Sequence, residues 1–164
     1  MILPFRKKSD EERLLEKVKQ GDANACEQMY HRYVCYLSAI CSRYLIHDDD
    51  IRDVLQESFL KVFSSIHTFS YRGEGSLKAW MARIVLNETL NFIKNNKKLD
   101  VVEIQPAHAA IADDAVQTAD VPTEVLYGFI RELPQGYRTV FNLYVIENKS
   151  HKEISQMLGI SEGT

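Results

Sequence analysis

Aromatic side chains and cations are interleaved over residues 71–98, with Phe69 just before them, a combination that can hold a strand of nucleic acid. The segment has six Lys and Arg residues against two Glu, although the whole chain carries a net charge of −3. Aromatic rings stack on unpaired bases, while cations neutralise the phosphates that join them. The segment is therefore the candidate nucleic-acid surface of the chain. Its candidate contact residues are Phe69, Tyr71, Arg72, Lys78, Trp80, Arg83, Lys94, Lys97 and Lys98.

Some of these residues have a purely structural alternative. Trp80 falls on an apolar helical stripe, so packing in a core is an equal alternative to stacking on a base. Lys94, Lys97 and Lys98 fall at the end of a predicted helix, where cations stabilise the negative end of the helix dipole. Tyr71 lies in a glycine-containing loop, which is harder to reconcile with a core position.

A second candidate surface consists of Asp53, Gln56 and Glu57. Their spacing of i, i+3 and i+4 places them on one face of a helix, away from Leu55 and Phe59. A compact acidic and amide face of this kind is either ordinary solvated surface or a docking site for a basic helical partner.

The sequence contains no recognisable catalytic set and no cofactor motif. Its five His residues show neither HxxxH nor HExxH spacing. The three cysteines, Cys26, Cys35 and Cys41, lack a CxxC pair, which favours buried reduced thiols over a disulfide or a zinc site. The aspartates at 48–50 point in divergent directions, so they are predicted to cap a helix rather than to bind a metal. We therefore predict a protein that is not an enzyme and needs no cofactor or metal.

The composition is that of a globular protein. A chain of 164 residues with 45% hydrophobic and 26% charged residues can fill one or two small cores. No stretch approaches the roughly 18 uninterrupted apolar residues of a membrane span, and residues 1–8 lack the apolar run of a secretory signal. The chain is therefore predicted to be cytoplasmic.

Helical periodicity predicts an all-α amino-terminal domain, residues 1–98, that positions both candidate surfaces. Apolar residues recur at three- and four-residue intervals in four predicted helices, at residues 10–20, 22–45, 48–66 and 77–96. We expect Asp10 to be the N-cap of the first helix. Residues 67–76 contain paired glycines and hydroxyls, which predict an ordered loop. The expected core positions of the last helix are Trp80, Ile84, Leu86 or Val85, Leu90 and Ile93.

Residues 99–122 are predicted to form a flexible acidic linker. They contain six Ala and two Pro, and their only charged residues are acidic. Such a segment cannot bury enough apolar surface to fold by itself. The linker therefore separates two small helical domains.

The second domain, residues 123–164, carries the pattern of a helix-turn-helix. Thr123 is a candidate N-cap, and Val140, Phe141 and Tyr144 form the expected apolar stripe of a helix over 135–147. A capping box, Ser150 to Glu153, opens a further short helix that Gly159 ends. A short helix, a glycine turn and a new serine cap are typical of a helix-turn-helix, although ordinary helical hairpins have the same signals.

Three motifs follow one another along the chain. They read Asp53-x-x-Gln56-Glu57-x-Phe59, then Ala79-Trp80-x-x-Arg83-Ile84-x-x-Asn87, and finally Leu133-Pro134-x-x-x-Arg138-x-Val140-Phe141 with Ser150-x-x-Glu153-Ile154-x-x-x-Leu158-Gly159-Ile160-Ser161-x-Gly163-Thr164. In this order the motifs resemble those of the bacterial sigma factors of the extracytoplasmic-function class. The resemblance covers about residues 10–98 and 124–164.

The resemblance implies a factor that confers promoter specificity on RNA polymerase. It implies that residues 1–98 bind core RNA polymerase through Asp53, Gln56 and Glu57 and open the minus-ten element, with Asn87 among the DNA contacts. It also implies that residues 123–164 read the minus-thirty-five element of promoter DNA, with Ser161 and Thr164 as contacts. The implied partners are core RNA polymerase, promoter DNA and an anti-sigma factor, all without membrane insertion.

The chain departs from the family pattern in three places. Asn91 stands where the family usually has Asp, and Lys94 stands where it often has Arg. The sequence ends at Thr164, where the family continues through its recognition helix, so a truncated second domain is expected. Two other classes stay open from the residues alone: a helix-turn-helix regulator that binds duplex DNA unaided, and a helical protein-binding adaptor. Tight binding to core polymerase with poor binding to isolated duplex promoter would distinguish the sigma factor.

Overall fold

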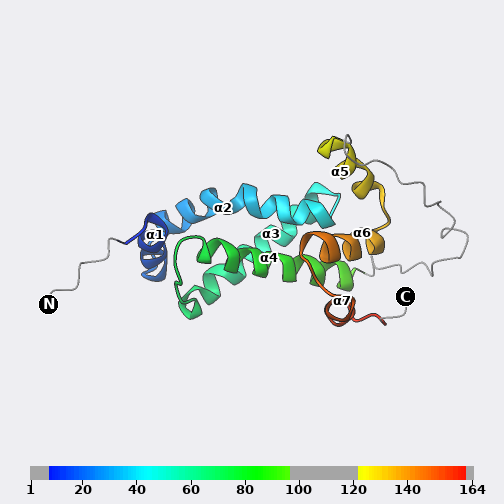
Figure 1. The fold of residues 1–164 in the computed structure, drawn as a ribbon. Coiled ribbons are helices and arrows are strands. Elements are labelled where there is room, and N and C mark those ends of the chain that lie inside the picture. The colour runs from blue at the N-terminus through cyan, green and yellow to red at the C-terminus, as the bar shows by residue number, and fades with distance from the viewer. Residues whose placement is uncertain (1–7, 97–121, 162–164) are drawn as a thin grey trace, which may run out of the picture. The chain divides into compact units, whose positions relative to one another are not determined.

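The structure, a computed structural model, describes residues 8–96 and 122–161. Every regular element in these residues is a helix, which confirms the predicted all-α class (Figure 1). The helices form two compact units. The first contains the described residues up to Ser42 together with His47–Thr89, and the second contains Arg43–Ile46 and the described residues from Leu90 onward. None of the described helices has the length and apolar content needed to cross a bilayer. The predicted linker lies outside the described residues except for Pro122.

Helix α1, Asp10–Lys19, has its N-cap one residue earlier than predicted. Its N-cap is Ser9, whose Oγ accepts a hydrogen bond from the backbone N–H of Glu12 at 3.1 Å. The expectation of an Asp10 cap was wrong because the serine before it has the extended backbone and the hydroxyl that capping needs. Asp10 instead lies in the first turn, where an acidic group stabilises the positive end of the helix dipole.

Helix α2, Ala23–Tyr44, and helix α3, Asp48–Ser65, follow α1 along the chain. Asp22 caps α2, since its Oδ1 accepts from the N–H of Ala25 at 3.2 Å. The N-cap of α3 is His47, which makes no side-chain capping bond, so the prediction that the following aspartates cap this helix was wrong. All three aspartates lie within its first turn and act on the dipole instead.

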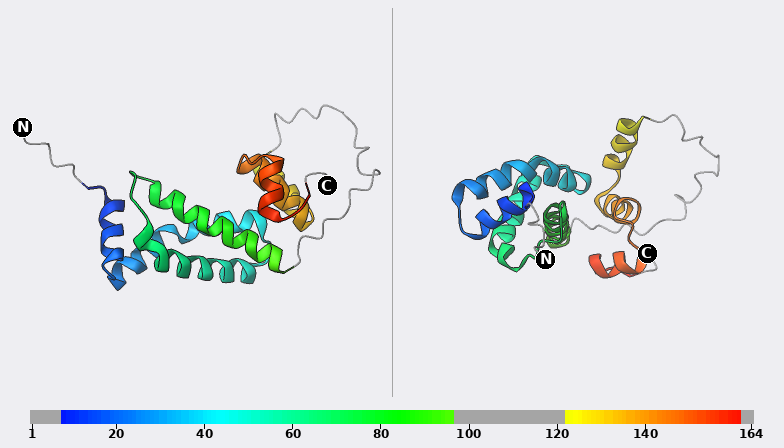
Figure 2. Two further views of the ribbon diagram at one scale, coloured as in Figure 1. Left: turned by 90° about the horizontal axis from the view of Figure 1, so that it is seen from below. Right: turned by 60° about the vertical axis from the view of Figure 1, so that its left-hand side comes forward.

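A short 3-10 turn η1, Ile66–Thr68, and an irregular loop, residues 69–75, lead into α4, Ser76–Asn95. The loop is ordered, as predicted: Ser76 donates to the carbonyl of Gly73 through both its N–H, at 3.1 Å, and its Oγ, at 2.6 Å. In Figure 2, α1 lies across the end of the α2–α4 bundle at which this loop is found.

The core-facing stripe of α4 is offset from the predicted one. Trp80 and Ile84 are only half-buried, so their assignment to the core was wrong. The α4 residues buried in the structure are Leu77, Met81, Val85, Leu86, Thr89, Leu90 and Ile93.

All three cysteines are free thiols. Only Cys41 is buried, whereas Cys35 is exposed and Cys26 is half-buried. The expectation of three buried thiols therefore holds for Cys41 alone.

Besides the last residues of α2 and α4, the described part of the second unit contains three α-helices and one π-helical turn. Their bounds are α5, Thr123–Glu132, α6, Gln135–Phe141, η4, Asn142–Ile146, and α7, His151–Leu158. The N-cap of α5 is Pro122, so Thr123 is its first helical residue rather than its cap.

The predicted stripe of Val140, Phe141 and Tyr144 does not form the buried face of α6 and η4. The buried residues are instead Gly136, Arg138, Thr139, Asn142 and Leu143. The predicted stripe was wrong because it assumed that only apolar side chains lie on the buried face of these helices. Arg138 is buried with its guanidinium donating to the carbonyls of Arg131, at 2.9 Å, and Leu133, at 3.0 Å, which satisfies its polar groups.

Candidate nucleic-acid interface

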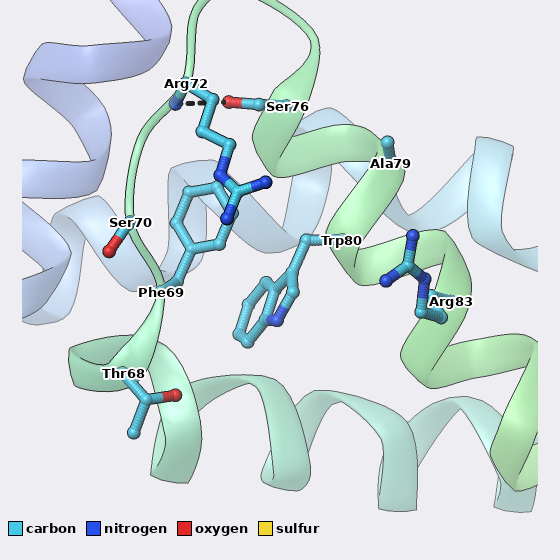
Figure 3. A pocket seen from close by; sticks show the side chains of 8 residues that line it. All are labelled: Thr68, Phe69, Ser70, Arg72, Ser76, Ala79, Trp80 and Arg83. Carbon is cyan, nitrogen blue, oxygen red and sulfur yellow. Dashed lines mark hydrogen bonds between the residues drawn. The ribbon is translucent and has the colours of Figure 1, made fainter.

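A cavity of about 360 Å³ opens between the 69–75 loop and the first half of α4, within the first unit. Figure 3 shows the side chains that line it, which come from η1, the loop and one face of α4. The lining residues are Thr68, Phe69, Ser70, Arg72, Ser76, Ala79, Trp80 and Arg83. Four of them, Phe69, Arg72, Trp80 and Arg83, are predicted DNA contacts.

Two aromatic rings meet at this cavity. The ring centroids of Phe69 and Trp80 are 4.9 Å apart with their planes inclined by 37°. Phe69 is only 9% exposed, whereas Trp80 is half-buried. Phe69 therefore packs against the indole of Trp80, which remains partly accessible at the cavity. Trp80 thus packs against Phe69 outside the buried core, and stacking on a base stays a prediction.

Two guanidinium groups flank the aromatic pair. Arg72 reaches the cavity from the loop and Arg83 from α4, and both side chains are exposed (Figure 3). An exposed guanidinium can pair with a phosphate through two parallel hydrogen bonds. The site therefore combines a stacking surface with cations on either side of it.

Tyr71 is not among the residues that line the cavity. Its side chain is half-buried, and its hydroxyl shares a hydrogen bond with the Oγ of Ser9, 2.6 Å between the oxygens. The structure therefore joins Tyr71 to α1 instead of grouping it with Phe69 and Trp80.

The other predicted DNA contacts are spread along α4 and beyond. Lys78 is exposed, and its Nζ lies 3.9 Å from the ring centroid of Tyr36, which is a cation–π contact. Asn87 and Lys94 are exposed farther along α4, as is Ser161 after α7. Three predicted contacts lie outside the described residues, namely Lys97, Lys98 and Thr164.

Asp53, Gln56 and Glu57 are all exposed on α3, as their spacing predicts. Gln56 also borders a groove of about 310 Å³ between α2 and α3. Large apolar side chains are accessible there, since Leu60 is 58% and Tyr30 41% exposed. The remaining lining residues of the groove are Arg52, Leu55, Phe59 and Phe63. An apolar groove with a polar rim is typical of a protein-binding surface.

Sequence reasoning missed three residues that contact the 69–75 loop: Ser9, which is the N-cap of α1, and Glu11 and Lys19 within that helix. They lie about fifty residues or more before the loop, so no local pattern joins them to it. One signal was available, because Glu11 falls on the same helical stripe as Leu14, Leu15 and Val18, which are buried. A carboxylate on a core-facing stripe requires a partner.

Over the residues that the structure describes, no cluster of His, Cys, Asp and Glu is arranged to hold a metal ion.

Comparison with known proteins gives matches over both units. The sequence matches Sigma-70 region 2 over residues 29–99 and Sigma-70, region 4 over residues 123–164. The ECF RNA polymerase sigma-E factor of Haemophilus influenzae is 29% identical, over 92% of this chain and 85% of that protein. The factor of the same name from Escherichia coli K12 is 24% identical, over 92% of this chain and 84% of that protein. A solved structure of CnrH in complex with the cytosolic domain of CnrY is 21% identical over 92% of this chain and 84% of that one, with a TM-score of 0.49.

An all-α chain with both Sigma-70 regions in this order belongs to the sigma-70 family, in its extracytoplasmic-function class. It binds core RNA polymerase and promoter DNA and directs promoter-specific initiation of transcription. The predicted class and function are therefore confirmed. The independent DNA-binding regulator and the adaptor are set aside. The expectation of a truncated second domain stays a prediction.

Proposed function

We propose that the cavity beside the 69–75 loop binds an unstacked base of the minus-ten element. The observation that carries the proposal is the Phe69–Trp80 ring pair, which offers a supported indole at a cavity mouth. Stacking of a base on an aromatic side chain contributes roughly 1–3 kcal/mol. Arg72 and Arg83 neutralise the phosphates on either side of that base, and Lys78, Asn87 and Lys94 extend the contact along α4.

The face of α3 that carries Asp53, Gln56 and Glu57 is proposed to dock onto core RNA polymerase. The two carboxylates attract a basic partner, and the apolar groove beside Gln56 supplies area for burial. Ser161 and Thr164 are proposed to contact the minus-thirty-five element from the second unit. The chain acts in the cytoplasm, without catalytic activity of its own, and an anti-sigma factor is a further proposed partner.

The base-binding proposal is tested with holoenzyme reconstituted from this chain and core RNA polymerase. The holoenzyme first selects a promoter from duplex DNA whose minus-ten segment is randomised, and that promoter is the probe. The reactivity of its unpaired thymines with permanganate then reports strand opening. Trp80→Ala should abolish opening while leaving core binding unchanged, since Trp80 is not among the residues that line the α3 groove. Trp80→Phe, the matched control, keeps an aromatic face and should retain much of the opening. Normal opening by Trp80→Ala would overturn the proposal.

A further inference from the structure

Helix α1 and its N-cap contact the 69–75 loop at three points: near the start of the loop, in the middle of the loop and at the end of the loop. Near the start, Lys19 Nζ donates to the carbonyl of Phe69 at 2.6 Å. In the middle, the hydroxyls of Ser9 and Tyr71 share their 2.6 Å hydrogen bond. At the end, Glu11 Oε2 accepts from the backbone N–H of Gly75 at 2.8 Å. The loop conformation thus depends on a helix that lines no part of the cavity.

The Glu11 contact differs from the other two because the carboxylate is buried. Glu11 is only 3% exposed, and its second oxygen, Oε1, accepts from the Tyr33 hydroxyl at 3.0 Å. Burial and the hydrogen bond to Glu11 raise the pKa of Tyr33 to about 12, so this hydroxyl keeps its proton at neutral pH. A buried carboxylate is tolerated when both oxygens are hydrogen-bonded and a helix N-terminus lies close by. Both conditions are met, since Glu11 lies in the first turn of α1.

Gly75 occupies the junction at which the loop becomes α4. Its φ of +83° is unfavourable for other residues, and its carbonyl accepts the N–H of Ala79 at 3.0 Å, which opens the helix. Trp80 is the residue after Ala79, one turn into α4. A bond that holds Gly75 therefore holds the point from which α4 carries Trp80 toward the cavity.

We infer that Glu11 is a positioning residue for base recognition: by accepting from Gly75 it fixes the loop and the start of α4, and hence the two walls of the cavity. The inference rests on the proposed base-binding function of that cavity. Glu11 touches no nucleotide in this scheme. It reduces the number of loop conformations that must be lost when a base binds, which favours the base that fits the preset cavity.

Two measurements test the inference. The first is amide hydrogen exchange of Gly75 in the free chain, which involves no DNA. The second is base discrimination by the holoenzyme, measured with single-stranded oligonucleotides that carry each of the four bases at one minus-ten position. Glu11→Ala should speed Gly75 exchange and reduce base discrimination, each by roughly tenfold, because a charge-assisted hydrogen bond is lost. Glu11→Gln should retain both, since its amide oxygen accepts from Gly75 and its N–H₂ donates to the Tyr33 hydroxyl.

Two control variants separate positioning from general stability. Tyr33→Phe removes the other hydrogen bond of Glu11 but leaves the Gly75 bond, so it should lower thermal stability while keeping base discrimination. Glu12→Ala removes the same charge from the same turn, where Glu12 bonds Ser9 through its backbone N–H, so discrimination should be unchanged.

Three results would overturn the inference. One is Glu11→Ala holoenzyme that discriminates bases like the unaltered protein. Another is Tyr33→Phe that loses as much discrimination as Glu11→Ala at an equal loss of thermal stability. The third is an unaltered holoenzyme that does not discriminate between bases, and this result overturns the proposed function as well. In that case Gly75 still exchanges faster in Glu11→Ala than in the unaltered chain, but the substitution has no effect on DNA binding.

Discussion

The hydroxyl of Tyr71 and the hydroxyl of Ser9 share a hydrogen bond of 2.6 Å that joins the 69–75 loop to the N-cap of α1. Ser9 therefore has two roles, because its Oγ also accepts from the N–H of Glu12. The sequence analysis predicts that Tyr71 stacks on a base, and the structure adds that its hydroxyl is bonded to the N-cap of α1. The hydroxyl of this tyrosine, more than its ring, is then the group on which loop order depends.

The first prediction follows from this bond. Tyr71→Phe and Ser9→Ala should each weaken holoenzyme binding to single-stranded minus-ten DNA, and the double variant should lose little more than either single one. Residues that share one hydrogen bond are non-additive in this way. Equilibrium binding of the four proteins to a fluorescent oligonucleotide measures the coupling. Ser9→Gly, which costs α1 only a few tenths of a kcal/mol in capping, controls for helix stability.

Purely additive effects would contradict this prediction. So would a Tyr71→Phe variant that binds normally while Tyr71→Ala binds weakly, since that pattern requires stacking by the ring.

The helical architecture was predictable because apolar periodicity and end signals agree along the chain. Gly21, with φ of +81°, ends α1 as expected, and both halves of the Ser150–Glu153 capping box form. What failed was the choice of inner face where a helix offers more than one apolar stripe. In α4 the stripes through Trp80 and through Leu77 are both apolar, and only packing against α2 and α3 selects the second.

The residues that line the candidate site could be predicted from the sequence, but the α1 residue that holds the loop in place could not. Phe69, Arg72, Trp80 and Arg83 fall close together in the sequence, so one helix and one loop suffice to gather them. The position of Glu11 on a core-facing stripe indicates that it needs a partner, but that partner is a backbone N–H 64 residues away, which no side-chain pattern identifies. Contacts of this kind depend on tertiary packing and need the structure.

The second prediction concerns the two guanidinium groups at the cavity. Arg72→Ala and Arg83→Ala should each lower the salt dependence of single-stranded DNA binding by about 0.7 in the slope of log K against log salt, as for one phosphate contact. Affinity should fall alike for all base sequences, because phosphates carry no sequence information. Titrations at several salt concentrations measure the slope. Lys152→Ala removes an exposed cation from the second unit and should leave the slope unchanged.

A third prediction concerns the polymerase-binding face of α3. Replacing Gln56 and Glu57 together with Ala should change the free energy of unfolding by no more than about 0.5 kcal/mol each, because both are exposed and Ala is a good helix former. Affinity for core RNA polymerase should fall clearly. Glu16→Ala, which removes one carboxylate from α1, is the matched control for charge and should bind core normally. Unchanged core affinity of the double variant would return these residues to ordinary solvated surface.

The last prediction concerns the capping box of α7 and its dependence on pH. The backbone N–H and the hydroxyl of Ser150 both donate to Glu153 Oε2 at 2.8 Å, and these bonds hold the pKa of Glu153 below its ordinary value. Because the folded-state pKa is the lower one, the box stabilises α7 fully above the ordinary pKa of Glu and loses this contribution as the pH falls through the folded-state value. An NMR titration of the Glu153 carboxyl carbon measures this pKa directly, and Ser150→Ala should raise it toward the ordinary value. Glu153→Gln keeps an acceptor at the same position, so α7 should stay capped while the acid-dependent loss disappears. An unshifted Glu153 pKa in the unaltered protein would show that the box is not formed in solution.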